Sequence, residues 1–561
     1  MLRLNEIKLP LGEADQDDHA ALRAAIVARL KIADAELLTF NISRRGYDAR
    51  KKAQILLVYT LDVEVRNEAA LLNKFRGDPR VIITPDTEYK FVGHAETGWQ
   101  GPRPVVIGLG PCGLFAALTL AQMGFKPIVL ERGKAVRERT QDTWGLWRKS
   151  TLNPESNVQF GEGGAGTFSD GKLWSQIKDP YFLGRKVLRE FVTAGAPAEI
   201  LYVSKPHIGT FKLVSMIEVM RAAIEALGGE IRFTAKVVDF EIETQGTQRQ
   251  LRGVVLEGGE VIQTNHLVLA IGHSARDTFY QLHERDVFME AKPFSIGFRI
   301  EHPQGLIDRA RFGPNAGNQM LGAADYKLVH HASNGRSVYS FCMCPGGTVV
   351  AATSEIGRVV TNGMSQYSRN ERNANAGIVV GVTPERDYPE HVLAGADFQR
   401  RWESAAFTAG GENYHAPAQL VGDFLAGRPS TELGGVVPSY QPGVKMTDLA
   451  SCVPAFVIAA IREALPVFEK QISGFAMPDA VLTGVETRTS SPIRITRRDD
   501  NFQSLNTAGL FPAGEGAGYA GGILSAGVDG IKIAEAVALS IAGANVTTRH
   551  KRAMQDDPHQ Y

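Results

Sequence analysis

A glycine-rich turn, spelled Val105-Val-Ile-Gly-Leu-Gly-Pro-Cys-Gly113, carries residues whose spacing suits ligand binding. Its pattern is Gly-x-Gly-x-x-Gly after a short apolar run. Gly108 permits a tight turn, Gly110 lets the backbone approach a pyrophosphate, and Gly113 lets a helix pack against its strand. The turn therefore predicts a dinucleotide-binding site.

The residues after the turn complete a strand–helix–strand unit. Phe115 to Met123 is apolar at helical spacing, and Pro127 to Leu130 reads as a second strand that ends on Glu131 and Arg132. A carboxylate roughly 20 residues beyond the glycines is placed to accept hydrogen bonds from ribose hydroxyls. We expect this unit to hold an ADP moiety, with Pro111 and Cys112 in the phosphate-binding turn.

A second glycine-rich segment lies near the C-terminus. It consists of a short apolar strand, Gly514 and Glu515, a glycine loop, and a predicted helix from Ile523 to Ala538. This arrangement resembles the C-terminal FAD signature of two-domain flavoproteins, in which a carboxylate after the strand binds the ribityl chain. The usual residue there is Asp, and here it is Glu515.

The helix that follows has a specific electrostatic use. Reduced flavin carries negative charge around N1 and C2=O, and free N–H groups at a helix N-terminus stabilise such charge. Gly521, Gly522 and Ile523 are the candidate donors.

Three further segments fit the same resemblance. Ala270-Ile-Gly272 matches the strand end that closes an FAD domain, and Val237 matches a position of backbone contact to adenine. The stretch from Asn157 to Lys172 is suited to wrapping the pyrophosphate and flavin, and its candidate glycines are Gly161, Gly163 and Gly164.

At this level nearly the whole chain resembles bacterial FAD-dependent oxidoreductases known as NAD(FAD)-utilizing dehydrogenases. The closest resemblance is to the subgroup with a small N-terminal α+β domain and its own C-terminal region. The segments Phe341 to Gly347 and Gly484 to Arg494 look like its distinctive motifs. The resemblance implies FAD and a fold, and it leaves the substrate open.

Cys342 and Cys344 alternate on a predicted strand, so both side chains are expected on one face. One interpretation is a redox pair that delivers electrons to flavin. The other is a pair of buried small hydrophobic residues, which the strand spacing favours because it strains a disulfide. Cys112 is expected to pack, since bound pyrophosphate would block access to its thiol.

Candidate catalytic groups also come from other segments. Arg488 and Arg494 flank a Ser/Thr-rich turn and could clamp a carboxylate or phosphate, or could pair with acids such as Glu486. His273 could donate a proton near the flavin, or could be a loop histidine satisfied by backbone. Lys172 is a further candidate. No spacing indicates a metal site.

Composition is that of an ordinary globular protein of several domains. The 561 residues are 44% hydrophobic and 22% charged, and 61 Lys and Arg balance 61 Asp and Glu, so nothing favours DNA or an anionic membrane. Four cysteines are too few for a disulfide scaffold. Without a signal-peptide pattern or a spanning apolar run, we expect a soluble cytoplasmic protein.

We expect an α/β protein with a Rossmann-like FAD-binding domain that is split by an inserted mixed α/β cap domain. The predicted boundaries are an N-terminal module over 1–98, the FAD domain over 99–284 and 486–548, the cap over 285–485, and a polar tail over 549–561. The N-terminal module alternates as β-α-β-β-α-β, the ferredoxin-like order, with its two middle strands joined by the turn Arg44-Arg-Gly-Tyr-Asp48.

The sequence predicts an FAD-dependent oxidoreductase that moves hydride between flavin N5 and a small molecule, with NADH or NADPH as a transient donor not excluded. A second hypothesis uses the basic cluster at Arg44, Arg45 and 50–52 to bind RNA, against which a solvated hairpin tip is the simpler interpretation. A third is FAD as a structural element without turnover. The oligomeric state is left open.

Overall fold

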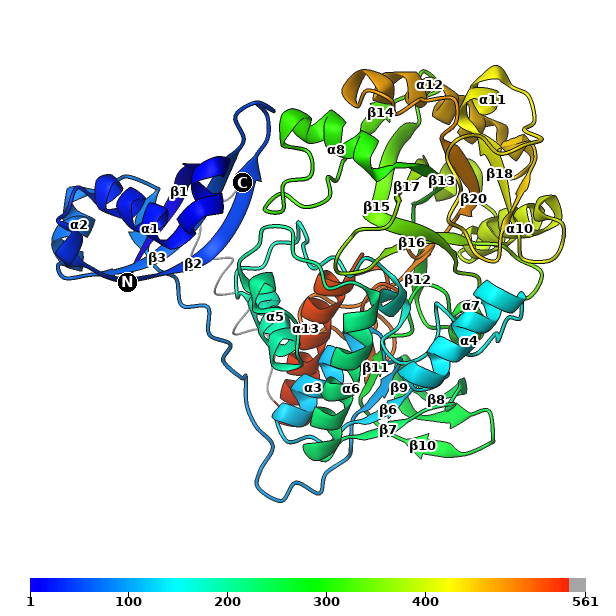
Figure 1. Cartoon of the computed structure of the whole chain (residues 1–561). Coiled ribbons are helices and arrows are strands. Elements are labelled where there is room, and N and C mark those ends of the chain that lie inside the picture. Colours follow the sequence, from blue (N-terminus) through cyan, green and yellow to red (C-terminus); the bar gives the residue numbers. More distant parts are fainter. Residues whose placement is uncertain (544–561) are drawn as a thin grey trace.

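The computed structural model describes residues 1–543, with the backbone alone over 13–18. The polar tail predicted over 549–561 lies outside the described residues. An N-terminal module sits beside a larger body, in which a domain built on a parallel sheet carries a domain built on a large, mainly antiparallel sheet (Figure 1). Within residues 1–543, no helix is both long enough and apolar enough to span a membrane.

The N-terminal module is a four-stranded sheet with two helices, in the sheet order β2-β3-β1-β4. Its elements are β1 (Leu2–Pro10), α1 (Leu11–Leu30), β2 (Leu37–Asp48), β3 (Leu56–Val65), α2 (Glu68–Lys74) and β4 (Val81–Ile83). The element order is therefore β-α-β-β-α-β. Alternate residues of β3, among them Leu57, Tyr59 and Leu61, are buried, which is the period of a sheet with one covered face.

The predicted turn over 44–48 is wrong. β2 continues through these residues and pairs with β3, with Arg44 opposite Thr60 and Asp48 opposite Leu56. The hairpin tip packs on the rest of the chain: the Arg45 N–H donates to the Tyr202 carbonyl at 2.6 Å, and the rings of Tyr47 and Phe312 meet edge-on at 5.6 Å. Part of the basic cluster is therefore engaged with the protein itself.

The parallel-sheet domain has five strands in the order β22-β11-β5-β6-β7, and every neighbouring pair is parallel. Its strands are β5 (Val105–Ile107), β6 (Ile128–Leu130), β7 (Glu230–Arg232), β11 (Leu267–Leu269) and β22 (Leu510–Pro512). Its helices are α3 (Pro111–Gln122), α4 (Val136–Lys149), α5 (Leu183–Thr193), α6 (Thr210–Ala226), α7 (Arg276–Glu284) and α13 (Ile523–Ile541).

The two faces of this sheet are covered differently. Val106, Val129 and Phe511 pack in one core with α3, α5, α6 and α13. Val105 and Ile107 pack in another core, against the three-stranded sheet of β8 (Val237–Gln245), β9 (Gln248–Leu256) and β10 (Val261–Gln263). Because both faces are covered, β5, β6, β11 and β22 are wholly apolar, as is typical of parallel sheets, whereas the edge strand β7 carries Glu230 and Arg232.

The large-sheet domain lies between the two parts of the parallel-sheet domain. Its path is β14-β15-β17-β13-β20-β18-β19, with β16 paired to β15 and one parallel pair, β18 with β19. Its strands are β13 (Phe294–Pro303), β14 (Val329–His331), β15 (Ser337–Ala351), β16 (Thr361–Ser365), β17 (Asn373–Val382), β18 (Ala416–Leu420), β19 (Val444–Met446) and β20 (Val481–Glu486). Its helices are α8 (Gln304–Phe312), α9 (Pro384–Asp387), α10 (Ala394–Gly410), α11 (Val421–Ala426) and α12 (Ala455–Gln471).

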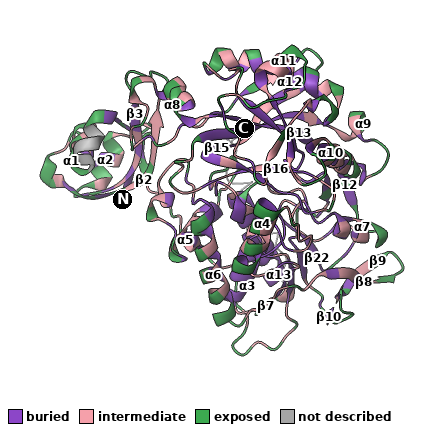
Figure 2. Cartoon of the chain, turned by 45° about the vertical axis from the view of Figure 1, so that its right-hand side comes forward, coloured by how far each residue is buried: buried purple, intermediate pink, exposed green. Residues whose placement is uncertain are grey.

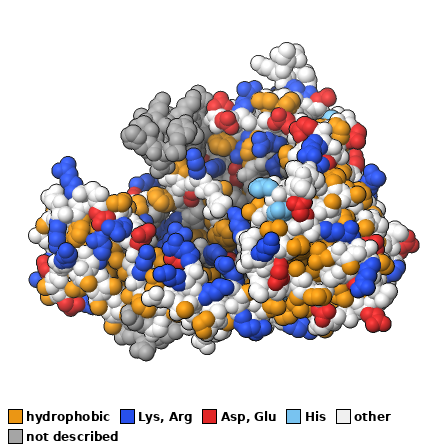
Figure 3. Space-filling model, turned by 90° about the horizontal axis from the view of Figure 1, so that it is seen from above, with side chains coloured by type: hydrophobic (Ala, Val, Ile, Leu, Met, Phe, Trp, Pro, Cys, Tyr) orange, Lys and Arg blue, Asp and Glu red, His pale blue; other side chains and the backbone are white. Residues whose placement is uncertain are grey.

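A short ribbon, β12 (Met289–Ala291) with β21 (Ile493–Ile495), marks where the chain passes between the two domains. The domains also join at α4, where the Trp147 indole N–H donates to the Ala351 carbonyl at 2.9 Å. The strands at the centre of both domains are buried, whereas the outer helix faces are exposed (Figure 2). Seen from above, Lys and Arg side chains gather beside a hollow between the N-terminal module and the larger body (Figure 3).

Candidate functional site

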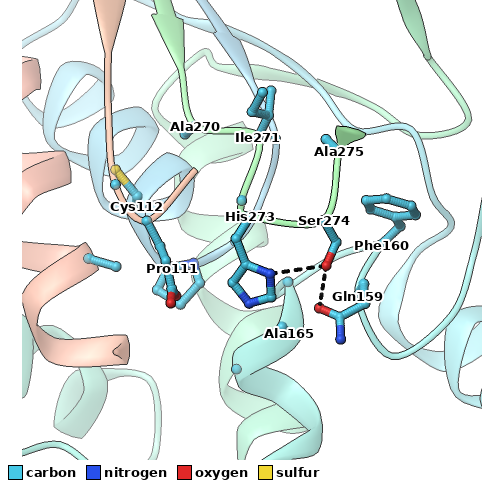
Figure 4. Close-up of a pocket in the computed structure, with 18 of the residues that line it drawn as sticks. Pro111, Cys112, Gln159, Phe160, Ala165, Ala270, Ile271, His273, Ser274 and Ala275 are labelled. Atoms are coloured by element: carbon cyan, nitrogen blue, oxygen red, sulfur yellow. Dashed lines mark hydrogen bonds between the residues drawn. The ribbon is translucent and has the colours of Figure 1, made fainter. Parts of the chain in front are cut away.

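A central cavity of about 380 Å³ lies beyond the carboxyl ends of β5, β6 and β11, the edge at which open α/β sheets bind ligands. Both glycine-rich segments contribute to its wall (Figure 4). The predicted cofactor residues that line it are Gly108, Gly110, Pro111, Cys112, Glu131, Arg132, Gly161, Gly164, Val237, Ala270, Gly272, Gly514, Glu515, Gly521, Gly522 and Ile523. Residues about 400 positions apart therefore meet in one cavity.

The three glycines of the first turn have different surroundings. A Cβ on Gly108 would lie 2.4 Å from the Ala270 carbonyl oxygen, so this position must pass close to β11. A Cβ on Gly113 would lie 1.9 Å from the Gly108 carbonyl oxygen, which makes Gly113 a packing residue that does not line the cavity. A Cβ on Gly110 would have only the Gly164 Cα near it, at 3.6 Å, and Gly110 lines the cavity.

Glu131 organises the loops around the turn. Its carboxylate accepts hydrogen bonds from the N–H groups of Leu109 at 2.8 Å, Gly133 at 2.9 Å and Gly161 at 3.0 Å. An ionised carboxylate has about four acceptor sites, so one remains for a ligand hydroxyl. The sequence predicted the ligand contact alone and missed this structural one.

Arg132 is committed to acids of the protein. Its guanidinium donates to Glu155 at 2.7 Å and to both oxygens of Asp277, at 2.9 and 2.8 Å. It also stacks over the Phe160 ring, 4.2 Å from the ring centre. Its positive charge is largely balanced, and it shapes the cavity wall chiefly as a rigid plane.

A buried arginine that sequence reasoning missed holds the glycine stretch in place. Arg139 is fully buried on α4, and its guanidinium donates to a ring of backbone carbonyls. The acceptors are Asn157, Val158, Gly161, Glu162 and Gly164. Only a planar, five-donor group can serve so many carbonyls at once, because its donors point outward in a fixed fork.

Gly163 corrects the prediction for this stretch. Gly163 does not line the cavity. Its Cα is packed against the protein, since a Cβ added there would lie 2.2 Å from Thr167 Oγ1 and 2.4 Å from Ile217. Its N–H donates to the Leu109 carbonyl at 2.8 Å, which ties the stretch to the first turn.

Replacing Arg139 by Lys is expected to destabilise the protein by about 3 kcal/mol and to weaken ligand binding in the cavity. Lysine keeps the charge but has three donors on a flexible stem, so buried carbonyls lose their partners. Urea unfolding measures the first effect. The exposed neighbour Arg137, changed to Lys, serves as the control, and an Arg139→Lys protein as stable as that control would contradict this role.

The N-terminus of α13 forms another part of the wall. Gly521, Gly522 and Ile523 all line the cavity. The Gly521 N–H donates to Ser525 Oγ at 3.2 Å, so it is not free as predicted. Gly522 and Ile523 stand at the helix start, where N–H groups have no partner within the helix. The positive end of the helix dipole therefore points at the cavity.

Glu515 also lines the cavity. Among residues 1–543, no hydrogen-bond donor reaches its carboxyl group. Burial raises the pKa of Glu515 to about 7, with nearby Lys292 opposing the shift and Cys342 adding to it. A carboxyl group without a protein partner is suited to pair with ligand hydroxyls.

Without ligand, Glu515 should make stability depend on pH. The unfolded carboxyl ionises near 4.5, whereas the folded one holds its proton up to about 7. Stability that is present below pH 4.5 is therefore lost as pH rises to about 7. We expect Glu515→Gln to become more stable relative to the unchanged protein over this interval, by about 1 kcal/mol after allowance for solvent in the cavity. Thermal unfolding at pH 4.5, 6 and 8 measures it, and a constant difference would contradict the assignment.

His273 reaches the cavity, and its Nδ1 lies 3.1 Å from Ser274 Oγ, which donates to Gln159 at 3.1 Å (Figure 4). Burial lowers the pKa of His273 to about 3, and the charges of Arg488 and Arg276 act in the same direction. The ring is therefore neutral at ordinary pH. It can offer one N–H to a ligand, and of the two sequence interpretations of His273 the charged proton donor does not fit this low pKa.

Arg488 also lines the cavity, but its charge is bound. It donates to both Glu403 oxygens at 3.1 Å and to Ser354 Oγ at 2.7 Å. Its partner is thus Glu403 rather than the predicted Glu486. Arg494 does not reach the cavity, because the alternation of β21 directs it to solvent beside Tyr519. The predicted two-arginine clamp is wrong.

Lys172 and Cys342 both line the cavity. Lys172 Nζ donates to the Met343 carbonyl and lies 3.4 Å from Asp170. Together with Phe341, Asn362 and Glu486, these residues form the wall that faces the large-sheet domain. No group of three or more potential metal ligands occurs within residues 1–543.

Three features of the cavity fit an FAD molecule. Glycines at Gly110, Gly272 and Gly522 leave open space where a side chain would stand, so they form a cradle. Two helix N-termini, of α3 and α13, end at the cavity and suit a pyrophosphate and an anionic ring. Glu515 supplies a carboxyl group without a protein partner. Fold and site therefore define a dinucleotide-binding protein of the FAD-dependent class.

Comparison with known proteins identifies the family. The model for "FAD-dependent protein, C-terminal domain-like" matches residues 293–489, and a domain of unknown function, DUF8436, matches residues 1–64. An uncharacterized protein of Clostridium beijerinckii is 46% identical over 540 residues, covering 95% of this chain and 98% of its own. The chain belongs to the same family as this relative, and its residues 293–489 match the FAD-dependent C-terminal domain family.

Solved structures show more distant likenesses. CtdE in complex with FAD is 11% identical, with 81% of this chain and 94% of that chain covered and a TM-score of 0.30. L-amino acid deaminase from Proteus vulgaris is 11% identical, with 81% and 97% covered and a TM-score of 0.34. These values are too low to bear on the reaction of this chain.

Proposed function

We propose that this protein is an FAD-dependent oxidoreductase that moves hydride between flavin and a small molecule, of the kind called NAD(FAD)-utilizing dehydrogenase. One observation carries the proposal. Two glycine-rich segments, one after β5 and one before α13, line a single cavity together with the unpartnered carboxyl group of Glu515. NAD-binding sites use the first of these features, whereas a ribityl chain and a flavin ring also need the other two.

Bound FAD would supply two-electron transfer at its flavin ring. The residues of the chain would bind the FAD and stabilise its charges. The N-terminus of α3 would neutralise the pyrophosphate, and Gly110 would let it approach the backbone. Glu515 would take the ribityl hydroxyls. The N–H groups of Gly522 and Ile523 would stabilise negative charge on the ring, since they end at the cavity.

The substrate would occupy the side of the cavity formed by the large-sheet domain. Phe341 supplies an apolar surface there, and Asn362, Glu486 and Arg488 supply polar groups. A bound molecule would be held between this wall and the flavin, away from bulk water. The neutral ring of His273 would position a polar substrate atom through its N–H rather than deliver a proton as a strong acid.

The electron donor is tested by anaerobic spectroscopy. We expect the purified full-length protein to be yellow or to become so with FAD, and NADH or NADPH to bleach it. Bleaching by a candidate substrate alone would indicate a substrate-driven dehydrogenase. Flavin that resists every physiological donor would favour FAD as a structural element, and a protein that never binds FAD would remove the proposal.

A further inference from the structure

Cys342 stands at an irregular point of β15. Pairing with β17 jumps from Phe341 opposite Gly377 to Cys344 opposite Asn375, so β15 has one extra residue there. Cys342 takes a left-handed backbone conformation, with φ of 42°. A bulge of this kind bends a strand and re-aims a side chain. Cys342 accordingly lines the central cavity.

Cys344 is fully buried and does not line the cavity, whereas Cys342 does, so the two side chains that the sequence placed on one face have different surroundings. Its thiol donates to the Cys342 carbonyl at 3.3 Å. The close fit is visible at Gly363, where a Cβ would lie 3.0 Å from the Cys344 sulfur and 2.5 Å from an Arg299 nitrogen. Both cysteines are free thiols in this structure.

Two cations surround this pair. Arg299 is fully buried, donates to the Cys342 carbonyl at 2.9 Å and is held by Glu486 at 2.8 Å. Lys172 Nζ bonds to the Met343 carbonyl, between the two cysteines in sequence. Both cations thus bracket the bend in β15, and each is fixed by a second partner.

The charges favour a thiolate at Cys342. The neighbouring Cys344 thiol holds the pKa of Cys342 well below its usual range, and Lys172 and Arg299 contribute while burial opposes. The neighbouring Cys342 side chain and burial raise the pKa of Cys344. One member of the pair is therefore the nucleophile, and the other carries the proton.

We propose that Cys342 and Cys344 form a redox-active dithiol that reduces small disulfides and is re-reduced by the flavin. Cys342 faces the cavity and is the attacking sulfur; Cys344, buried behind it, is the resolving one. This proposal rests on the proposed flavoprotein function for its electrons. Because only one residue separates the cysteines, their disulfide closes a tight ring, and strained disulfides are readily reduced.

The electrons balance in three steps. The Cys342 thiolate attacks a disulfide RS–SR′, forms a mixed disulfide with RS and releases R′S⁻. Cys344 then attacks the Cys342 sulfur while its proton passes to the departing sulfur, so RSH is released and a Cys342–Cys344 disulfide is left. Bound FAD in its reduced form would supply the hydride equivalent that turns this disulfide back into the Cys342 thiolate and the Cys344 thiol. NADH or NADPH would be the two-electron donor for the flavin.

Mass spectrometry tests the thiol chemistry without any need for flavin. The full chain is treated anaerobically with 2-hydroxyethyl disulfide, alkylated and cut with trypsin, which releases both cysteines on the peptide from Ser337 to Arg358. We expect this peptide to be lighter by two hydrogens and not alkylated. Cys344→Ser should instead trap the hydroxyethylthio group on Cys342, Cys342→Ser should stay unmodified, and Cys452→Ser should behave as the unchanged chain. Two alkylated thiols in the unchanged chain would overturn the proposal.

A reductive titration tests the electron transfer. The disulfide-oxidised holoprotein should consume two more electrons per flavin than Cys342→Ser, which stays unmodified, and equal consumption would overturn the coupling to flavin. The two proposals fail separately. Bound flavin without disulfide formation removes the dithiol alone, whereas a disulfide in a protein that never binds FAD removes the proposed function and the flavin step.

Discussion

Replacing Glu403 by Ala should lower the free energy of unfolding by about 3 to 5 kcal/mol, because it removes the buried carboxylate that two buried arginines share. The Glu403 carboxylate accepts from Arg276 at 2.7 and 3.0 Å and from Arg488 at 3.1 Å. Glu403 lies on α10 of the large-sheet domain, whereas Arg276 begins α7 of the parallel-sheet domain. The cluster therefore links the two domains directly behind the cavity.

Chemical denaturation measures this loss, with Glu432→Ala as the control, since Glu432 is an exposed acid of the same domain. Glu403→Gln keeps the shape and should cost less than Ala. A Glu403→Ala protein as stable as the control would mean that water or other acids satisfy both arginines, and would contradict the link between the domains.

Replacing Gly110 by Val should weaken FAD binding by about 100-fold, or about 2.7 kcal/mol, while leaving the fold intact. Gly110 has φ of −74° and ψ of −178°, which any residue can adopt, and its Cβ would point into the open cavity. The added methyl groups would stand where a pyrophosphate must approach the backbone. Flavin retained after gel filtration and the unfolding temperature measure the two effects.

Gly113→Ala, in the same turn, should have the opposite effect and lower the stability of the fold. Its Cβ would lie 1.9 Å from the Gly108 carbonyl oxygen, so α3 must move away from β5. We expect destabilisation of about 3 kcal/mol, at the upper end for overpacked sites. If Gly110→Val lost stability as Gly113→Ala does, or kept its flavin, the division of roles between these glycines would be wrong.

The sequence predicted those elements whose signals are local. The glycine turn, the apolar strand before it and the helix from Ile523 depend on neighbouring residues, and the structure has all three. Residues 231–239 have the alternating pattern of one strand, but they belong to two strands, β7 and β8, because Thr234 takes a positive φ between them. The alternation of apolar and polar residues along the chain does not reveal such a break.

Long-range partners could not be predicted. Arg139 is one arginine among many in the sequence, and its role depends on carbonyls that a separate loop presents. Arg488 pairs with Glu403, which lies 85 residues earlier. The re-aimed Cys342 depends on a register shift between β15 and β17. Each of these features follows from tertiary packing, which spacing along the chain does not encode.

The most direct test of the central claim is a titration of the flavin-free full chain with FAD, followed by flavin fluorescence. The geometry of the cavity predicts saturation at one FAD per chain, about 100-fold weaker binding for Gly110→Val, and unchanged binding for Glu432→Ala. An unchanged chain that leaves the fluorescence of FAD unaltered, or a Gly110→Val chain that binds FAD equally well, would contradict the assignment of this cavity to FAD.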